Sequence, residues 1–246
     1  MKFHFRLFLW TGVFAIAMAF VESAVVVYLR AIYYPEGFAF PLKVLDARIE
    51  FTEAIREAAT MIMLLSIAFI SQKGALSRFA VFIYAFAVWD IFYYLFLFLL
   101  LSWPASFFTW DILFLIPVIW VGPVLAPLIN SMTMIILALL IISSKGKNQE
   151  FRLQPFEWSL LIAGAVITIL SYTQPYLHFL LDKFTFRDLL HFGSNKKIME
   201  YSLNFIPLNF SWFLFGSGEL LFLCSIGKMI FRITYSGSGH RSNRNF

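Results

Sequence analysis

Six apolar stretches, each long enough to cross a membrane as a helix, dominate the sequence. They lie roughly at residues 7–28, 51–70, 79–101, 121–142, 158–176 and 209–231. About 20 helical residues cross the hydrocarbon core of a bilayer, which is about 30 Å thick. The pattern predicts an all-α, polytopic integral membrane helix bundle with six transmembrane spans. We expect residues 1–235 to form a single domain and residues 236–246 to form a disordered cytoplasmic tail.

Composition excludes several other classes of protein. Apolar residues make up 61% of the chain and charged residues 13%, and the mean hydropathy is +0.80. A soluble domain has about 45–50% apolar and about 25% charged residues, so this chain lacks the polar surface to face water. Its 19 Lys and Arg residues are scattered, which argues against a nucleic-acid partner. The expected partner is therefore the lipid bilayer.

The sequence contains no motif for a metal or a cofactor. Cys224 is the only cysteine, so an intrachain disulfide and a cysteine-based metal site are both excluded. The four histidines lie outside the apolar stretches: His4, His178, His191 and His240. Glu-x-x-His, His-Glu-x-x-His, P-loop and Gly-x-Ser-x-Gly motifs are missing as well. We expect no metal site and no cofactor.

Basic residues in the short loops predict the orientation. The loops after the second and fourth stretches contain Lys73, Arg78, Lys145, Lys147 and Arg152. The loop at residues 102–110, after the third stretch, contains neither Lys nor Arg. Cytoplasmic loops carry an excess of these residues, so we expect both termini to be cytoplasmic. The expected location is a cell membrane of the bacterial inner-membrane type.

Residues 103–127 contain an unusual density of proline and tryptophan. Proline interrupts helices, and irregular backbone at membrane depth must be covered by protein or line a wet cavity. We therefore expect a re-entrant or interfacial segment before the fourth span, with a short helix that ends near Pro117. Asp111 either lines the outer mouth of a cavity or N-caps a helix that begins after Thr109.

Ionisable residues in or near the spans are the main functional signal. They are Glu22, Glu53, Arg56, Glu57, Asp90, Asp111 and Glu219. A charged side chain at the bilayer centre costs about 2.5–3.5 kcal/mol on insertion scales, so each one needs a partner, water or a shifted pKa. The acids outnumber the basic residues in this set, although Arg30 can reach down from the interface. The surplus predicts that some of these acids carry a proton or bind something positive.

Two interpretations of the group on the second span remain open. Glu53, Arg56 and Glu57 are spaced i, i+3 and i+4, which places them on one helical face. Glu22 of the first span is expected at a similar depth. These residues form either a structural ion-pair network that joins two helices or the lining of an outward-facing polar cavity.

Asp90 and Glu219 are expected near the middle of the membrane, about 15 Å from the ends of their spans. Tyr93 or Tyr94 can donate a hydrogen bond to Asp90, which is then either a proton carrier or a neutral acid bonded to a helix carbonyl. Glu219 follows a Gly-Ser-Gly sequence. Those small residues either allow close helix packing or mark an unwound turn.

Three functions fit these residues. The leading hypothesis is the binding or movement of a small cation or a proton-coupled solute. Glu22 and Glu57 would then be ligands at the cavity mouth, Arg56 a fixed counter-charge, and Asp90 or Glu219 the titrating group.

The second hypothesis is a membrane enzyme that acts on a lipid or quinone-like headgroup at the outer leaflet, with a carboxylate as general base and Arg56 holding an anion. The third is a non-catalytic subunit of a larger membrane complex. Ala15 and Ala19 form a small-x-x-x-small pair, which is typical of a contact with a partner subunit or with a second copy of the chain.

Overall fold

The structure is a computed structural model that describes residues 2–147, 149–189 and 196–242. Six helices in these residues have the length and hydropathy of membrane spans. They are α1 (Lys2–Tyr33), α2 (Ala47–Ser71), α3 (Ala75–Leu101), α4 (Leu125–Lys147), α5 (Pro155–Leu181) and α8 (Trp212–Ser242). Two short helices, α6 (Phe186–Leu189) and α7 (Lys196–Ser202), follow α5 and precede α8 along the chain. The predicted all-α polytopic membrane bundle is confirmed.

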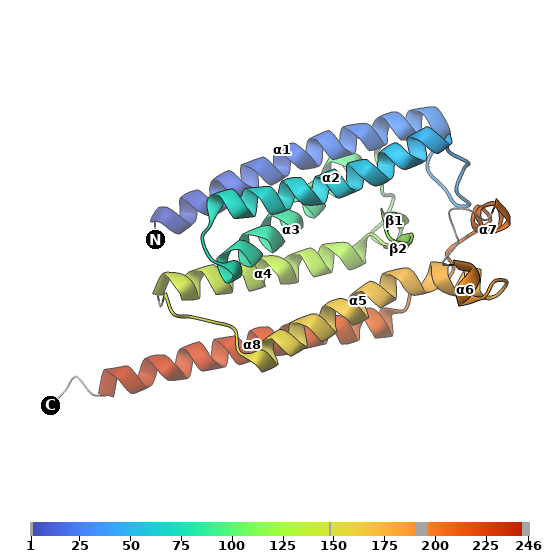
Figure 1. Ribbon diagram of the computed structural model, residues 1–246. Coiled ribbons are helices and arrows are strands. Elements are labelled where there is room, and N and C mark those ends of the chain that lie inside the picture. Colours follow the sequence, from blue (N-terminus) through green and yellow to red (C-terminus); the bar gives the residue numbers. More distant parts are fainter. Residues whose placement is uncertain (1, 148, 190–195, 243–246) are drawn as a thin grey trace.

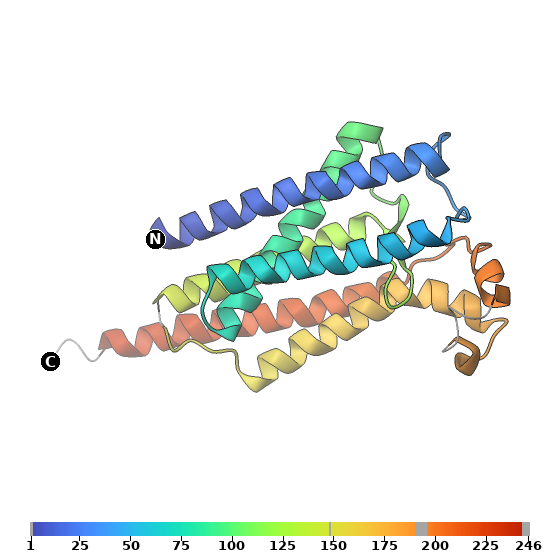
Figure 2. The same ribbon diagram turned by 45° about the horizontal axis from the view of Figure 1, so that its top comes forward.

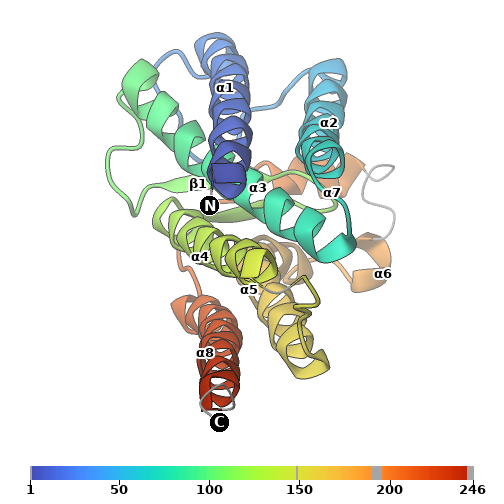
Figure 3. The same cartoon turned by 90° about the vertical axis from the view of Figure 1, so that its left-hand side faces the viewer.

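Both ends of the chain lie at one end of the bundle, and a small β-hairpin, α6 and α7 lie at the other (Figure 1). We call these ends the terminal side and the hairpin side, and the same arrangement is visible after rotation (Figure 2). Viewed from the terminal side, α4 lies between the group α1–α2–α3 and the pair α5–α8 (Figure 3). Helix α3 packs against both α1 and α4, whereas α5 packs against α8.

The interior of the terminal-side half contains a large apolar cluster. Ala80 and Val81 of α3 are fully buried together with Ala138 and Ile141 of α4. On the outer surface, large apolar side chains such as Phe213 of α8 remain exposed. Such exposure is expected where lipid, which is as apolar as leucine, covers the protein.

The small pair on the first span packs inside this chain. Ala15 and Ala19 of α1 are fully buried in a cluster that contains Ala85 and Val88 of α3. Their small side chains therefore serve the close contact between α1 and α3. The prediction that they mark a contact with another subunit was wrong.

Residues 110–123 form a β-hairpin rather than the short helix that we predicted. Strand β1 (Trp110–Phe114) pairs antiparallel with β2 (Trp120–Pro123), and Asp111 faces Gly122 in the register. Aromatic and β-branched residues favour strands, and the prolines exclude a regular helix. Helix α4 consequently begins at Leu125, later than predicted, with Pro127 in its first turn, where the missing N–H has no intrahelical partner to lose.

Helix α8 is longer than predicted at its C-terminal end. It runs to Ser242, so the backbone of residues 236–242 is helical where we expected a disordered tail. The rest of that tail, residues 243–246, lies outside the described residues. The Gly-Ser-Gly sequence before Glu219 is also helical, which rules out the unwound turn.

Two glycines bring α5 and α8 close together. A Cβ added to Gly218 would press against the Thr168 hydroxyl and lie 3.0 Å from the Gly164 carbonyl oxygen. A Cβ added to Gly164 would in turn lie 2.9 Å from the Phe222 ring. The close packing that we considered for the Gly-Ser-Gly sequence is therefore what the structure shows, with Gly218 as the residue responsible.

Gly218→Ala is expected to lower the stability of the bundle, because overpacking costs about 1–3 kcal/mol. Gly216→Ala is the matched control on the same helix, since nothing lies within 4 Å of its added Cβ. Alanine there should leave stability unchanged or raise it by up to about 1 kcal/mol through helix propensity. Thermal unfolding of the purified protein in detergent measures both. Equal effects of the two substitutions would contradict the glycine contact.

Candidate functional site

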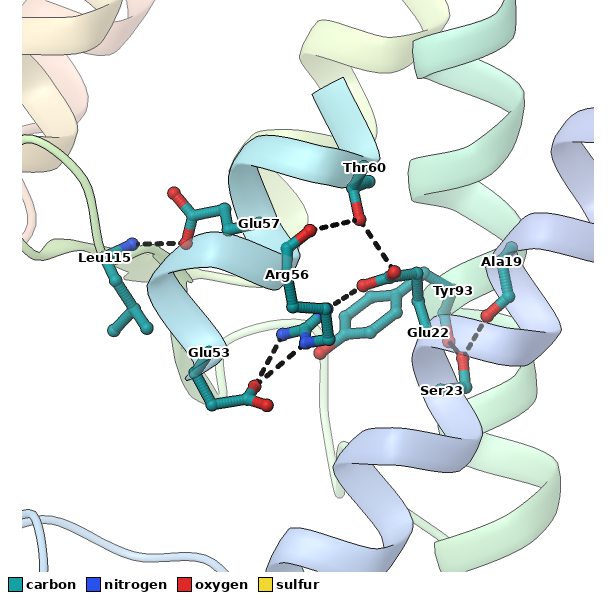
Figure 4. Close-up of polar contacts among 9 residues, drawn as sticks. All are labelled: Ala19, Glu22, Ser23, Glu53, Arg56, Glu57, Thr60, Tyr93 and Leu115. Carbon is teal, nitrogen blue, oxygen red and sulfur yellow. Dashed lines mark hydrogen bonds and ion pairs between the residues drawn. The ribbon is translucent and has the colours of Figure 1, made fainter. Parts of the chain in front are cut away.

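A charged cluster joins α1 to α2 (Figure 4). Arg56 donates to Glu53 from Nε at 3.0 Å and from one terminal nitrogen at 2.8 Å, and its other terminal nitrogen pairs with Glu22. The second oxygen of Glu22 accepts a hydrogen bond from the Thr60 hydroxyl at 2.7 Å. Because residues 53, 56 and 60 recur at three- and four-residue spacing, one face of α2 presents all three to α1. The structure therefore contains the ion-pair network, and all three guanidinium nitrogens of Arg56 are occupied by it.

Glu57 points away from this cluster and holds the hairpin. Its two carboxylate oxygens accept hydrogen bonds from the backbone amides of Leu115 at 2.8 Å and Ile116 at 3.2 Å. Figure 4 shows Leu115 and Glu22 on opposite sides of α2. Glu57 and Glu22 therefore have separate partners, although the sequence places them at a similar depth in the membrane.

A second charged cluster lies where the hairpin meets α1 and α3. Asp111 of β1 is 3% exposed, lies 3.5 Å from a guanidinium nitrogen of Arg30 and accepts a hydrogen bond from the Tyr94 hydroxyl at 3.2 Å. The guanidinium carbon of Arg30 lies 3.8 Å from the centre of the Trp103 ring. Arg30 does reach down to an acid, as expected. Asp111 lies in a strand, so the prediction that it N-caps a helix was wrong.

Burial sets the protonation of Asp111. It raises the pKa of this carboxyl to about 6, against the opposing effects of the Arg30 charge, the Ile112 amide and the Tyr94 hydroxyl. Asp111 is consequently ionised at neutral pH and becomes protonated within the mildly acidic range.

Asp90 and Glu219 lie on either side of α4. Asp90 of α3 accepts a hydrogen bond from Ser131 at 2.8 Å, and Glu219 of α8 accepts one from Thr133 at 2.7 Å. They are 9% and 6% exposed, and no ion pair with either carboxylate occurs among the residues that the structure describes. Two neighbouring hydroxyls of one helix therefore hold two buried acids without a basic partner.

The tyrosines take other positions than we predicted. Tyr94 donates to Asp111 and not to Asp90. The ring of Tyr93 lies beside Arg56 (Figure 4). The backbone carbonyl oxygen of Tyr93 accepts a hydrogen bond from the Ser23 hydroxyl at 3.1 Å. The hydrogen-bond donor of Asp90 is Ser131, a residue of a different helix. Sequence neighbours of Asp90 could not reveal this partner.

Several buried polar atoms of the described residues have no hydrogen-bond partner. Within the described part of the chain, Oε1 of Glu219 and the indole nitrogens of Trp89 and Trp120 have no hydrogen-bond partner. Two donors, on α3 and β2, and one acceptor, on α8, are therefore not used by the described residues.

One buried ion pair was missed by the sequence analysis. Glu157 of α5 is completely buried and pairs with Arg232 of α8 at 3.0 Å, and Arg232 also donates to the carbonyl of Arg152. Glu157 and Gln154 form a capping box at the start of α5, a pattern that could have identified the helix start. Nothing in the local sequence indicated the pairing with a residue 75 positions away.

Glu57→Ala is expected to loosen the hairpin. It leaves the partly buried amides of Leu115 and Ile116 without this acceptor, at a cost below the roughly 1–3 kcal/mol of a fully buried donor, because water can reach them. Hydrogen–deuterium exchange of the purified protein should therefore become faster in residues 110–123. The exposed Glu50 of α2 supplies the control, since Glu50→Ala leaves the hairpin contacts intact. Unchanged exchange in the Glu57 variant would show that the hairpin does not depend on this residue.

The pKa of Asp111 predicts a titration between about pH 5 and pH 7. Because burial raises this pKa above its ordinary value, the contribution of Asp111 to stability is greatest below about pH 4 and is lost as the pH rises through about 6. Difference infrared spectra should show a carboxylic-acid band that appears on acidification and is missing from Asp111→Asn. The absence of an Asp111-dependent band in this range would contradict the assignment.

Comparison with known proteins does not place the chain in a family. No protein-family model matches it, and neither curated proteins nor solved structures show a match. The interpretation of the two charged clusters and the two hydroxyl-bound acids therefore rests on their own chemistry.

Proposed function

We propose that the protein binds and moves protons or a small cation at the hairpin side of the membrane, with Asp90 and Glu219 as the exchanging groups. One observation carries the proposal: both acids are buried at depth in spans and bonded to hydroxyls, with no basic partner among the described residues. The proposed setting is a bacterial-type inner membrane with cytoplasmic termini, which places the hairpin side outside.

The chemistry of a buried acid supports this role. An isolated carboxylate in hydrocarbon is costly, so it holds either a proton or a cation. A hydroxyl can donate to an ionised carboxylate and accept from a protonated one, so Ser131 and Thr133 suit both states. The two acids can therefore change occupancy without losing their hydrogen bonds.

The position of the acids supports access from one side. Asp90 is 11 residues from the end of α3 and Glu219 is 7 residues from the start of α8. These separations correspond to about 16 Å and about 10 Å from the hairpin-side ends of the helices. The fully buried apolar cluster around Val81 and Ile141 fills the terminal-side half. Exchange from the hairpin side is therefore the shorter and more polar route.

The remaining acids have structural roles in this proposal. Arg56 is the fixed counter-charge of Glu22 and Glu53, and Glu57 holds the hairpin. The alternative of an enzyme that holds an anion on Arg56 receives no support, because its guanidinium nitrogens are all bonded to carboxylates.

Liposomes that contain the purified protein and an entrapped pH-sensitive dye test the proposal. With an imposed potassium diffusion potential, the wild-type protein should carry protons, and Asp90→Asn and Glu219→Gln should fall to the rate of protein-free liposomes. Uptake of radioactive sodium in parallel distinguishes a cation from a proton. Glu36→Gln removes an exposed acid on the hairpin side and should retain wild-type flux.

Folding must be checked before the fluxes are compared. Each variant should give the same gel-filtration profile and the same thermal unfolding transition as the wild type. Wild-type flux in both acid variants would overturn the proposal and would leave the acids with a structural role.

A further inference from the structure

A cavity of about 340 Å³ lies at the hairpin-side ends of α1 and α3, apart from Asp90 and Glu219. Its lining combines the last turn of α1, the following loop and the end of α3, with Arg30, Tyr34, Phe38, Ser102 and Trp103 among its residues. The membrane-spanning parts of the two helices end at Tyr33 and Leu101. The cavity therefore lies at the level where lipid headgroups meet the hydrocarbon core.

Arg30 is the charged group of this cavity. The residue is 8% exposed, and its guanidinium carbon lies 3.8 Å from the Trp103 ring centre and 4.7 Å from that of Phe38. The contact between its guanidinium and Asp111 is long, at 3.5 Å. No acceptor among the described residues takes a hydrogen bond from the guanidinium N–H groups. Contacts to the ring faces leave the edge of a guanidinium available, and that edge matches the oxygens of a phosphate.

Two hydroxyls add further donors to the cavity lining. The oxygen of Tyr34 accepts a hydrogen bond from the Lys43 amide at 2.8 Å, which leaves its own proton to donate. Ser102 has a left-handed backbone conformation, with φ of 52°, at the point where the chain turns from α3 toward Trp103. No acidic residue is part of the lining. The carboxylate of Asp111 lies beside these donors, 3.5 Å from Arg30, but is not part of the lining.

The apolar part of the lining completes the site. Val27, Ala31 and Leu101 contribute aliphatic walls next to the donors. A polar group that enters from bulk water needs no such wall, whereas a headgroup with attached chains does. We infer that this cavity binds the phosphate group of an anionic amphiphile, with Arg30 as the principal donor and Tyr34 and Ser102 as supporting donors. This inference does not depend on the proposed proton or cation movement.

Calorimetric titration of the purified protein in detergent tests the site with three probes. They are short-chain phosphatidylglycerol, short-chain phosphatidylcholine and inorganic phosphate. The wild type should bind phosphatidylglycerol more tightly than phosphatidylcholine. Binding of phosphatidylglycerol alone identifies a lipid as the source of the phosphate, whereas comparable binding of inorganic phosphate identifies a free anion at the same donors.

Two variants address the site in different ways. The double substitution Arg30→Gln/Asp111→Asn removes the guanidinium without leaving a buried carboxylate unpaired, and it should weaken binding of phosphatidylglycerol by about tenfold or more. Ala31→Phe fills the cavity at an exposed position and leaves Arg30 in place, so it should also weaken binding and serves if the double variant fails to fold. Arg48→Gln is the control, because it removes an exposed positive charge at the start of α2 on the same side.

The control variant should bind like the wild type. Equal binding of phosphatidylglycerol and phosphatidylcholine by the wild type would overturn the inference. Wild-type affinity for phosphatidylglycerol in both Ala31→Phe and a folded double variant would overturn it too. An equal loss of affinity for phosphatidylglycerol in Arg48→Gln and in the double variant would show that the effect comes from surface charge. That result would overturn the inference as well.

Discussion

A polar side chain inside this bundle must find its partner within the protein, because hydrocarbon offers none. The buried acids meet this requirement in three ways. Glu22 and Glu53 share a guanidinium, Glu57 takes two backbone amides, and Asp90 takes a serine hydroxyl. In the proposed role, only the last arrangement lets the carboxylate exchange a proton or a cation and keep its hydrogen bond, because a hydroxyl can both donate and accept. The same constraint therefore separates structural acids from the proposed functional ones.

The hairpin depends on the same chemistry. Its connecting loop is tied to α2 through Glu57, and its first strand is tied to α1 and α3 through Asp111. In the second strand, Gly122 allows the Tyr172 ring of α5 to approach to the distance of a tight contact. Irregular backbone is thus held by side chains from helices on both sides of α4, so the hairpin connects the two helix groups in addition to α4 itself.

The two halves of the bundle differ in polarity. Most of the buried acids lie in the hairpin-side halves of their helices, whereas apolar side chains form a large buried cluster on the terminal side. The buried pair of Glu157 and Arg232 is the exception, and it joins α5 to α8 next to residues of that apolar cluster such as Leu161 and Met229. Both proposed sites, the hydroxyl-bound acids and the cavity at Arg30, consequently lie on the same side of the molecule.

The sequence by itself determined the six spans, their approximate bounds and the identity of most buried acids, because hydropathy and helical rise depend only on local composition. It also indicated that Arg30 could serve an acid, and it placed Glu53 and Arg56 on one face. The tertiary structure alone decided the rotation of each helix, and with it the choice of Ser131 over Tyr93 or Tyr94 for Asp90 and the pairing of Glu157 with Arg232. It also decided that residues 110–123 pair as strands, because proline and aromatic residues suit several irregular forms and only the contacts with neighbouring helices select one of them.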